Sequence, residues 1–309
     1  MGHSYQLGVD GCGTKKELIL IDPAGTIVAR HLAPGCNPSQ VGPDNARALL
    51  HEALARLVAQ SPIRDPQSEI HSTLLCLAGN RGFWRETAAA LQGYGRVTTT
   101  DDSVPVLELA TAGAPGLVLH AGTGSFVAAR TADGATHYAG GLGWKLGDPG
   151  SGYDIGRRAI ALALLEIQGW PPSGATGPSA LAQALQAHTG LADYAANSRF
   201  FYYDPEANAR IAAFAPRVVE LAEQDCGPAQ QVLADSITEL ARLADQVIHR
   251  LFPKPATRLP CGVSGRVLNS PASAFALRSL ASKLSWPVEL RFVDTAPIEG
   301  VRRLLLASR

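Results

Sequence analysis

The chain has 309 residues, 46% of them hydrophobic, which is enough for two domains that each bury a core. Its 27 basic and 27 acidic residues balance, and no long basic run occurs, which argues against nucleic acid or an anionic membrane as a partner. Apolar stretches are too short to cross a bilayer and the N-terminus lacks a signal-peptide core, so we expect a cytoplasmic protein. Five widely spaced cysteines argue against a disulfide framework, a zinc site or an iron–sulfur cluster.

The first part of the chain predicts three strands followed by alternating helices and strands. A turn, Gly11-Cys12-Gly13-Thr14, follows the first strand, as phosphate-binding turns do. The expected strands cover 5–11, 17–21, 26–31, 73–77 and 96–100, and the expected helices cover 44–60, 83–91 and 103–112. The order is therefore β-β-β-α-β-α-β-α.

The same order repeats in the second part. Strands are expected at 117–121, 125–130, 135–139, 258–261 and 288–292, and helices at 152–168, 272–284 and 298–308. A helical insertion at 169–252 interrupts this copy. We expect an α/β protein with a domain at 1–115, to which the C-terminal helix (298–309) is a candidate addition, and a second domain at 116–297. The two domains are expected to face each other across a ligand-binding cleft.

Residues 118–158 contain the densest group of glycines. Gly122 and Gly124 are expected at positive φ, which would align backbone N–H groups toward an anion, while Thr123 and Ser125 add hydroxyl donors. A helix beginning near Ser151 would direct its positive N-terminus toward this region. The alternative interpretation is a glycine-rich hairpin and loop without a ligand.

These motifs carry a family resemblance. GVDGCGTK (8–15) and HAGTGS (120–125) resemble the two phosphate motifs of the sugar kinase, Hsp70 and actin superfamily, and CGVSG (261–265) resembles its adenosine motif. Together with GGLGWKLGDPGSG (140–152), they are most similar to the BadF/BadG/BcrA/BcrD ATPase family, and within it to the N-acetylglucosamine kinases. The resemblance implies two ribonuclease H-like domains, ATP and Mg²⁺ as cofactors, and a sugar as acceptor. The paired cysteines of the family's dehydratase activators are missing.

The resemblance also assigns roles at the nucleotide end. Asp10 would hold Mg²⁺, and the alternative is a residue that only caps a turn. Thr14 and Lys15 would donate to phosphate oxygens, whereas Lys16 is expected to be solvated. The remaining expected ATP contacts are Gly11, Gly13, Gly122, Thr123, Gly124, Ser125, Gly262 and Gly265.

The general base is expected at the end of strand 96–100, where Asp101 and Asp102 are both candidates. Asp102 fits the related kinases better, because a small residue, Ser103, follows it. The other aspartate would be a helix N-cap, which is also the alternative interpretation of either one.

The expected sugar contacts are Asn37, Gly143, Trp144 and Asp148, with Trp144 stacked on the sugar ring. Alternatively, Asn37 is a turn residue and Trp144 belongs to the core. His120 receives no role, since a strand histidine is more often structural. The predicted activity is phosphorylation of N-acetylglucosamine on O6. Glucosamine or another hexose as acceptor, a regulatory ATPase without a sugar substrate and a silent sugar sensor remain open, as do a monomer and a homodimer.

Overall fold

The structure, a computed structural model, describes residues 4–61, 63, 69–171, 177–204 and 206–308. The chain forms two compact units, Met1–Gly113 together with Thr295–Arg309, and Ala114–Asp294. In the part of the chain that is described, none of the helices is long and apolar enough to span a membrane.

The first unit contains a five-stranded mixed sheet with the order β3-β2-β1-β4-β5. Strands β1, β2 and β3 pair antiparallel, and β4 and β5 add in parallel to β1. The strands are β1 (Ser4–Gly11), β2 (Lys15–Ile21), β3 (Ile27–Pro34), β4 (Glu69–Leu77) and β5 (Arg96–Thr100). The helices are α1 (Pro38–Val41), α2 (Pro43–Gln60), α3 (Arg81–Ala90), α4 (Ser103–Thr111) and α12 (Pro297–Ala307).

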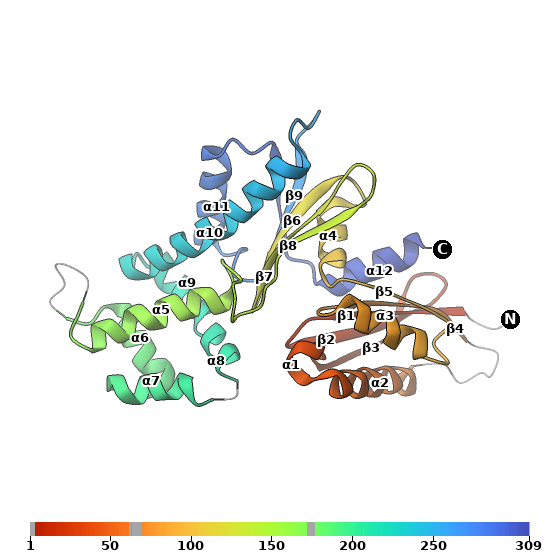
Figure 1. Cartoon of the computed structure of the whole chain (residues 1–309), viewed down its shortest axis with the longest axis horizontal. Coiled ribbons are helices and arrows are strands. Elements are labelled where there is room, and N and C mark those ends of the chain that lie inside the picture. Colours follow the sequence, from red (N-terminus) through yellow and green to blue (C-terminus); the bar gives the residue numbers. More distant parts are fainter. Residues whose placement is uncertain (1–3, 62, 64–68, 172–176, 205, 309) are drawn as a thin grey trace. The chain divides into compact units, whose positions relative to one another are not determined.

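Helices cover both faces of this sheet. Successive side chains of a strand point to opposite sides, so a strand that is apolar throughout contributes to a core on each face. On β2, Leu18 and Leu20 belong to the core under α2 and α3, whereas Ile19 and Ile21 belong to the core under α12. Helix α12 also packs on α4, on the side of the sheet opposite α2 (Figure 1). A Cβ at Gly300 of α12 would overlap the backbone of α4, so glycine is needed for this close helix contact.

The second unit repeats the topology with the sheet order β10-β9-β6-β7-β8. Its strands are β6 (Gly116–Ala121), β7 (Ser125–Arg130), β8 (Thr136–Gly140), β9 (Leu259–Ser264) and β10 (Val288–Val293). Its helices are α5 (Gly152–Ile167), α6 (Ala180–Thr189), α7 (Tyr194–Tyr202), α8 (Ala207–Ala213), α9 (Ala215–Glu223), α10 (Gly227–Leu251) and α11 (Pro271–Lys283). The expected duplicated α/β fold with two ribonuclease H-like sheets is confirmed.

The predicted insertion at 169–252 contains the helices α6 to α10, which share one large core with α5, α11 and the sheet. Within this insertion, the helical region 207–223 is divided into α8 and α9 at Phe214. Pro216 explains the break, because it has no N–H to donate and its ring disfavours a continuous helix through the preceding turn.

Candidate functional site

The turn between β1 and β2 is held tightly by backbone contacts. The N–H of Cys12 donates to Lys15 O at 2.9 Å, and the N–H of Gly35 donates to Thr14 O at 3.1 Å. A Cβ at Gly35 would overlap the carbonyl group of Gly13, so the segment after β3 must carry glycine to pack on this turn. Thr14 and Lys15 remain exposed. Their side chains are therefore available to a ligand.

The expectation that Lys16 is solvated is wrong. Its side chain is 1% exposed, and Nζ donates to Pro34 O at 2.7 Å. Burial lowers the pKa of this ammonium group. Neighbouring residues of a strand point to opposite faces, so Lys15 faces solvent while Lys16 connects β2 to the end of β3.

Two other carboxylates influence Asp10, which lies near the end of β1. Asp10 lies opposite Glu17 of β2 in the antiparallel register, and Asp102 follows β5. Burial, then the charges of Asp102 and Glu17, raise the pKa of Asp10 to about 7, although Lys15 acts in the opposite direction. A cation beside Asp10 would relieve this repulsion.

Asp101 and Asp102 have different environments. Asp101 accepts from Arg81 Nε at 2.9 Å and also pairs with Nη2 of the same guanidinium. Asp102 occupies the N-cap position of α4, but its side chain makes no cap hydrogen bond to the helix. Burial and then the charge of Asp101 raise the pKa of Asp102 to about 6, although the N–H groups of Asp102 and Ser103 act in the opposite direction. The capping interpretation therefore does not explain Asp102.

Asn37 does have a local structural role. Its Oδ1 accepts from Ser39 N at 3.0 Å and so caps the single turn of α1. The same oxygen would lie 2.8 Å from a Cβ at Gly79, which follows β4. The turn interpretation of Asn37 is confirmed, and its role toward a sugar stays a prediction.

The turn between β6 and β7 differs from the sequence-based expectation. Neither Gly122 nor Gly124 has a φ in the left-handed region. Glycine is needed at 124 for space, because a Cβ there would lie 2.7 Å from Oδ2 of Asp148. Ser125 is buried and donates to Pro149 O at 2.6 Å. Its hydroxyl thus anchors the following loop.

Helix α5 begins at Gly152, and its first turn points at the β6–β7 turn as expected. Its N–H groups are already used, however. Gly152 N donates to Gly122 O at 2.8 Å, and Tyr153 N donates to Thr123 O at 3.3 Å. Asp154 N donates to the hydroxyl of the N-cap Ser151. These bonds orient the turn, so the helix end is not an open anion site.

The loop from 141 to 150 is fixed at its base and exposed at its tip. Asp148 has a φ of +69° and is 5% exposed, and its Oδ1 accepts from Gly143 N at 3.2 Å. Burial raises the pKa of Asp148. Trp144 is 37% exposed and packs against Tyr153, so the interpretation of Trp144 as core is wrong.

The turn after β9 lies against the turn after β6. Gly265 has a φ of +100°, and a Cβ there would overlap the backbone of Ala121. Only glycine fits this position. Gly262, expected in the turn, lies inside β9 and is buried, because the strand extends to Ser264.

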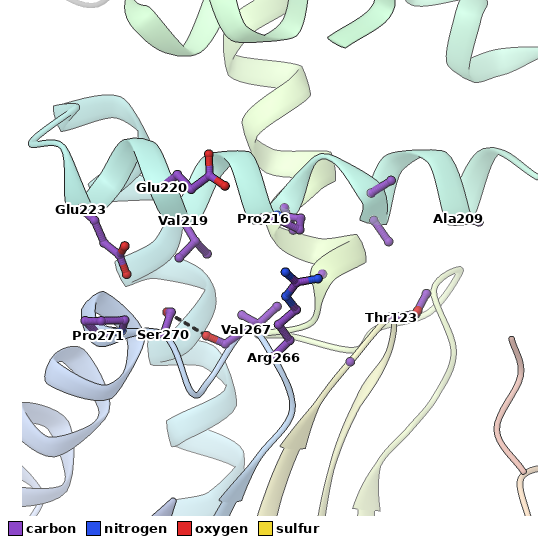
Figure 2. A pocket seen from close by; sticks show the side chains of 15 residues that line it. Thr123, Ala209, Pro216, Val219, Glu220, Glu223, Arg266, Val267, Ser270 and Pro271 are labelled. Atoms are coloured by element: carbon purple, nitrogen blue, oxygen red, sulfur yellow. Dashed lines mark hydrogen bonds between the residues drawn. The ribbon is translucent and has the colours of Figure 1, made fainter. Parts of the chain in front are cut away.

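A cavity of about 530 Å³ opens beside these two turns (Figure 2). Thr123 lies at one end, Glu223 with Ser270 and Pro271 at the other, and the Arg266 side chain between them. The lining residues are Gly122, Thr123, Gly152, Ala209, Ala212, Ala213, Ala215, Pro216, Val219, Glu220, Glu223, Arg266, Val267, Ser270 and Pro271.

Sequence reasoning missed most of this lining. Helices α8 and α9 of the insertion contribute the alanine-rich wall with Pro216 and Val219, and α9 adds Glu220 and Glu223. Arg266 directly follows Gly265, which was the one available signal. The apolar walls and the guanidinium suit a flat heterocycle attached to an anionic group.

Comparison with known proteins gives relatives over most of the chain. The chain is 28% identical over 281 residues to N-acetyl-D-glucosamine kinase of Dictyostelium discoideum, which covers 86% of each protein. It is 28% identical over 171 residues to N-acetylmuramic acid/N-acetylglucosamine kinase of Clostridium acetobutylicum, which covers 52% of this chain and 53% of that protein.

Solved structures agree on the fold. A Chromobacterium violaceum protein, provisionally named an N-acetylglucosamine kinase, matches with a TM-score of 0.75 and 24% identity, over 98% of this chain and 99% of the other. A Porphyromonas gingivalis protein with the same provisional name matches with a TM-score of 0.72 and 21% identity, over 96% and 97%. Residues 7–283 match the BadF/BadG/BcrA/BcrD ATPase family. The protein therefore belongs to this family of ATPases.

Proposed function

We propose that the protein is a sugar kinase that transfers the γ-phosphoryl group of ATP to the 6-hydroxyl of N-acetylglucosamine. The observation that carries the proposal is Asp102, a carboxyl group with a raised pKa and no capping hydrogen bond at the end of a parallel strand. Ligands of α/β sheets gather at such strand ends. Family membership and the two kinase relatives support the same activity.

In this mechanism Asp102 accepts the proton of the sugar hydroxyl. The bond between O6 and the γ-phosphorus forms while the bond from the γ-phosphorus to the bridging oxygen breaks, and ADP leaves. A pKa of about 6 keeps Asp102 ionised at neutral pH yet more basic than an ordinary aspartate. Such general-base assistance contributes roughly 10²–10⁴-fold in rate.

The carboxylates around Asp10 fit a magnesium ion. Magnesium binds through one or two carboxylates and otherwise keeps waters and phosphate oxygens. Asp10 is the first candidate ligand, with Asp102 and Glu17 close enough to raise its pKa. Within the described residues no group of three or more acidic, histidine or cysteine side chains is arranged to hold a metal ion, so the protein would supply one or two carboxylates and the other ligands would be water and phosphate oxygens. When bound, Mg²⁺ would neutralise phosphate charge.

The nucleotide would occupy the cavity of the second unit. Its base and ribose would lie along the apolar walls and Arg266, and its phosphates would point toward Gly122 and Thr123. In the first unit, Thr14 and Lys15 are exposed donors for phosphate oxygens.

For the sugar we propose contacts from Asn37, Gly143, Trp144 and Asp148. The half-exposed Trp144 offers an apolar face to a sugar ring. Asp148 contributes mainly by holding Gly143 in place, since the carboxylate is buried and accepts from its N–H. The glycine-rich loop has no second acid to pair with the ammonium of glucosamine, which favours the neutral acetamido sugar.

A coupled assay of ADP release with a panel of sugars tests the proposal. We expect turnover that depends on N-acetylglucosamine and a lower kcat/KM for glucosamine, glucose and N-acetylmuramic acid. The matched control is Asp102→Asn, which should bind ATP but turn over roughly 10²–10⁴-fold more slowly. ATP hydrolysis that no sugar changes would instead identify a regulatory ATPase. A tenfold preference for glucosamine would refute the acetamido assignment but keep the kinase.

A further inference from the structure

His120 has a defined environment that the proposed function does not use. The residue lies on β6, two positions before Gly122. Its ring stacks on Phe126 of β7 with ring centroids 5.0 Å apart, and Phe126 stacks in turn on Tyr138 of β8. These contacts across the sheet fix the plane of the imidazole.

One ring nitrogen of His120 connects the two glycine turns of the second unit. Nδ1 lies 3.3 Å from the hydroxyl oxygen of Ser264, which is the residue opposite His120 on β9. Ser264 directly precedes Gly265, whose backbone contacts Ala121. The pair therefore joins the two strand ends whose following turns line the nucleotide cavity.

The other nitrogen points at the turn itself. Nε2 lies 3.5 Å from the position that a Cβ on Gly122 would occupy. Within the described part of the chain, Nε2 makes no hydrogen bond. Among the described residues His120 is only partly buried, and Nε2 is not one of the buried polar atoms that lack a partner, so an acceptor on a ligand at the Gly122 turn can reach it.

The protonation state determines what Nε2 can do. Burial lowers the pKa of His120 to about 4, so the ring is neutral at neutral pH and carries one proton. If the Ser264 hydroxyl donates to Nδ1, that proton must lie on Nε2. Nε2 then becomes a neutral hydrogen-bond donor beside Gly122.

We propose that His120 is a further ATP ligand, which donates from Nε2 to a phosphate oxygen held at the Gly122 turn, with Ser264 fixing the tautomer. The inference rests on the proposed use of ATP by this cavity. His120 would add a side-chain donor to this turn, where the hydroxyl of Ser125 already donates to Pro149 O.

Two substitutions separate this role from a structural one. In His120→Gln the side-chain amide reaches the position of Nε2, whereas in His120→Asn it reaches only the position of Nδ1. The dissociation constants of a non-hydrolysable ATP analogue with Mg²⁺ and of adenosine are measured by calorimetry for both variants and the wild type. Thermal melts report folding.

We expect His120→Gln to bind the ATP analogue within about threefold of the wild type and His120→Asn roughly tenfold or more weakly, as for loss of a hydrogen bond to a charged group. Adenosine should bind both variants like the wild type, because it has no phosphate. Equal ATP affinity in the two variants would overturn the proposal, and so would a parallel loss of ATP and adenosine.

Ser264→Ala covers the case in which the His120 variants do not fold. It should weaken the ATP analogue several-fold and leave adenosine unchanged, and unchanged ATP binding would refute the assignment of the tautomer and donor. Failure of the wild type to bind the ATP analogue would refute the proposed function as well. Wild-type binding without a difference between the variants refutes the role of His120 alone.

Discussion

The ionised carboxylate of Asp102 is expected to destabilise the folded protein. Its pKa is raised from 3.8 to about 6, so the folded state disfavours the charged carboxylate. A raised carboxyl pKa means that the folded state binds the proton more tightly than the unfolded state, and stability is therefore lost as pH rises through the interval between these values. Replacing the carboxylate by an amide of the same shape should recover part of this loss.

The magnitude follows from the shift. A difference of about two pKa units corresponds to roughly 3 kcal/mol at pH 8. Asp102 keeps some solvent contact, so we expect Asp102→Asn to stabilise by about 1–3 kcal/mol at that pH. For a unit of this size, the melting temperature would rise by roughly 4–11 °C. About half of the gain should remain at pH 5, and it should largely disappear only near pH 4, at the lower end of the interval between the two pKa values.

Thermal melts from about pH 4 to about pH 8, without nucleotide and with a chelator, measure this effect. Asp101→Asn is the matched control, since it removes the partner of Arg81 and should be neutral or destabilising by up to about 1 kcal/mol. The reasoning is refuted if Asp102→Asn destabilises at pH 8 or if its effect does not change with pH. Sugar phosphorylation retained by Asp102→Asn would separately refute the proposal that Asp102 is the general base.

Three further results are expected. The kcat/KM for the sugar should fall about tenfold from pH 7.5 to pH 5 as Asp102 with its pKa of about 6 is protonated, and a flat profile would contradict this. Gly265→Ala should weaken ATP binding about tenfold or more in a fluorescence titration, because the alanine Cβ would overlap the backbone of Ala121. Gly134→Ala is the control: Gly134 also has a positive φ but lies in open space, so this variant should keep its ATP affinity. Lys15→Ala should raise the KM for ATP without lowering the melting temperature. Lys16→Ala should instead lower the free energy of unfolding by about 2 kcal/mol or more, because Lys16 is buried and bonded to Pro34 O. The reverse pattern would mean that the two lysines have exchanged places on β2.

The sequence predicted the elements and their order because periodicity is a local property. Strand 125–130 has the expected bounds, and β5 matches the expectation at 96–100. The repeat of three antiparallel strands and two parallel additions implied two similar sheets, and both have the same strand order. Glycine at 265 was also predictable as a turn residue, although its reason, contact with Ala121, needed the fold.

The site could be predicted only in part. The strand ends at Asp10, Asp102 and Gly122 follow from the motifs, but the pairing of Asp101 with Arg81, which is 20 positions away, does not. Local patterns hold no information on that pairing. The structure gives Asp101 a partner and leaves Asp102 without a capping bond.

The sequence by itself determined where strands end in glycine turns, because turn chemistry and strand alternation are encoded over a few residues. Only the tertiary structure decided what surrounds those turns. The insertion has helical periodicity but no motif, and it supplies a wall of the cavity with Pro216, Val219 and Glu223. Lys16 is buried, and its ammonium group donates a hydrogen bond to Pro34 O at the end of β3. The physical reason is that burial and pairing depend on contacts between segments far apart in the chain, which hydrophobic periodicity does not specify.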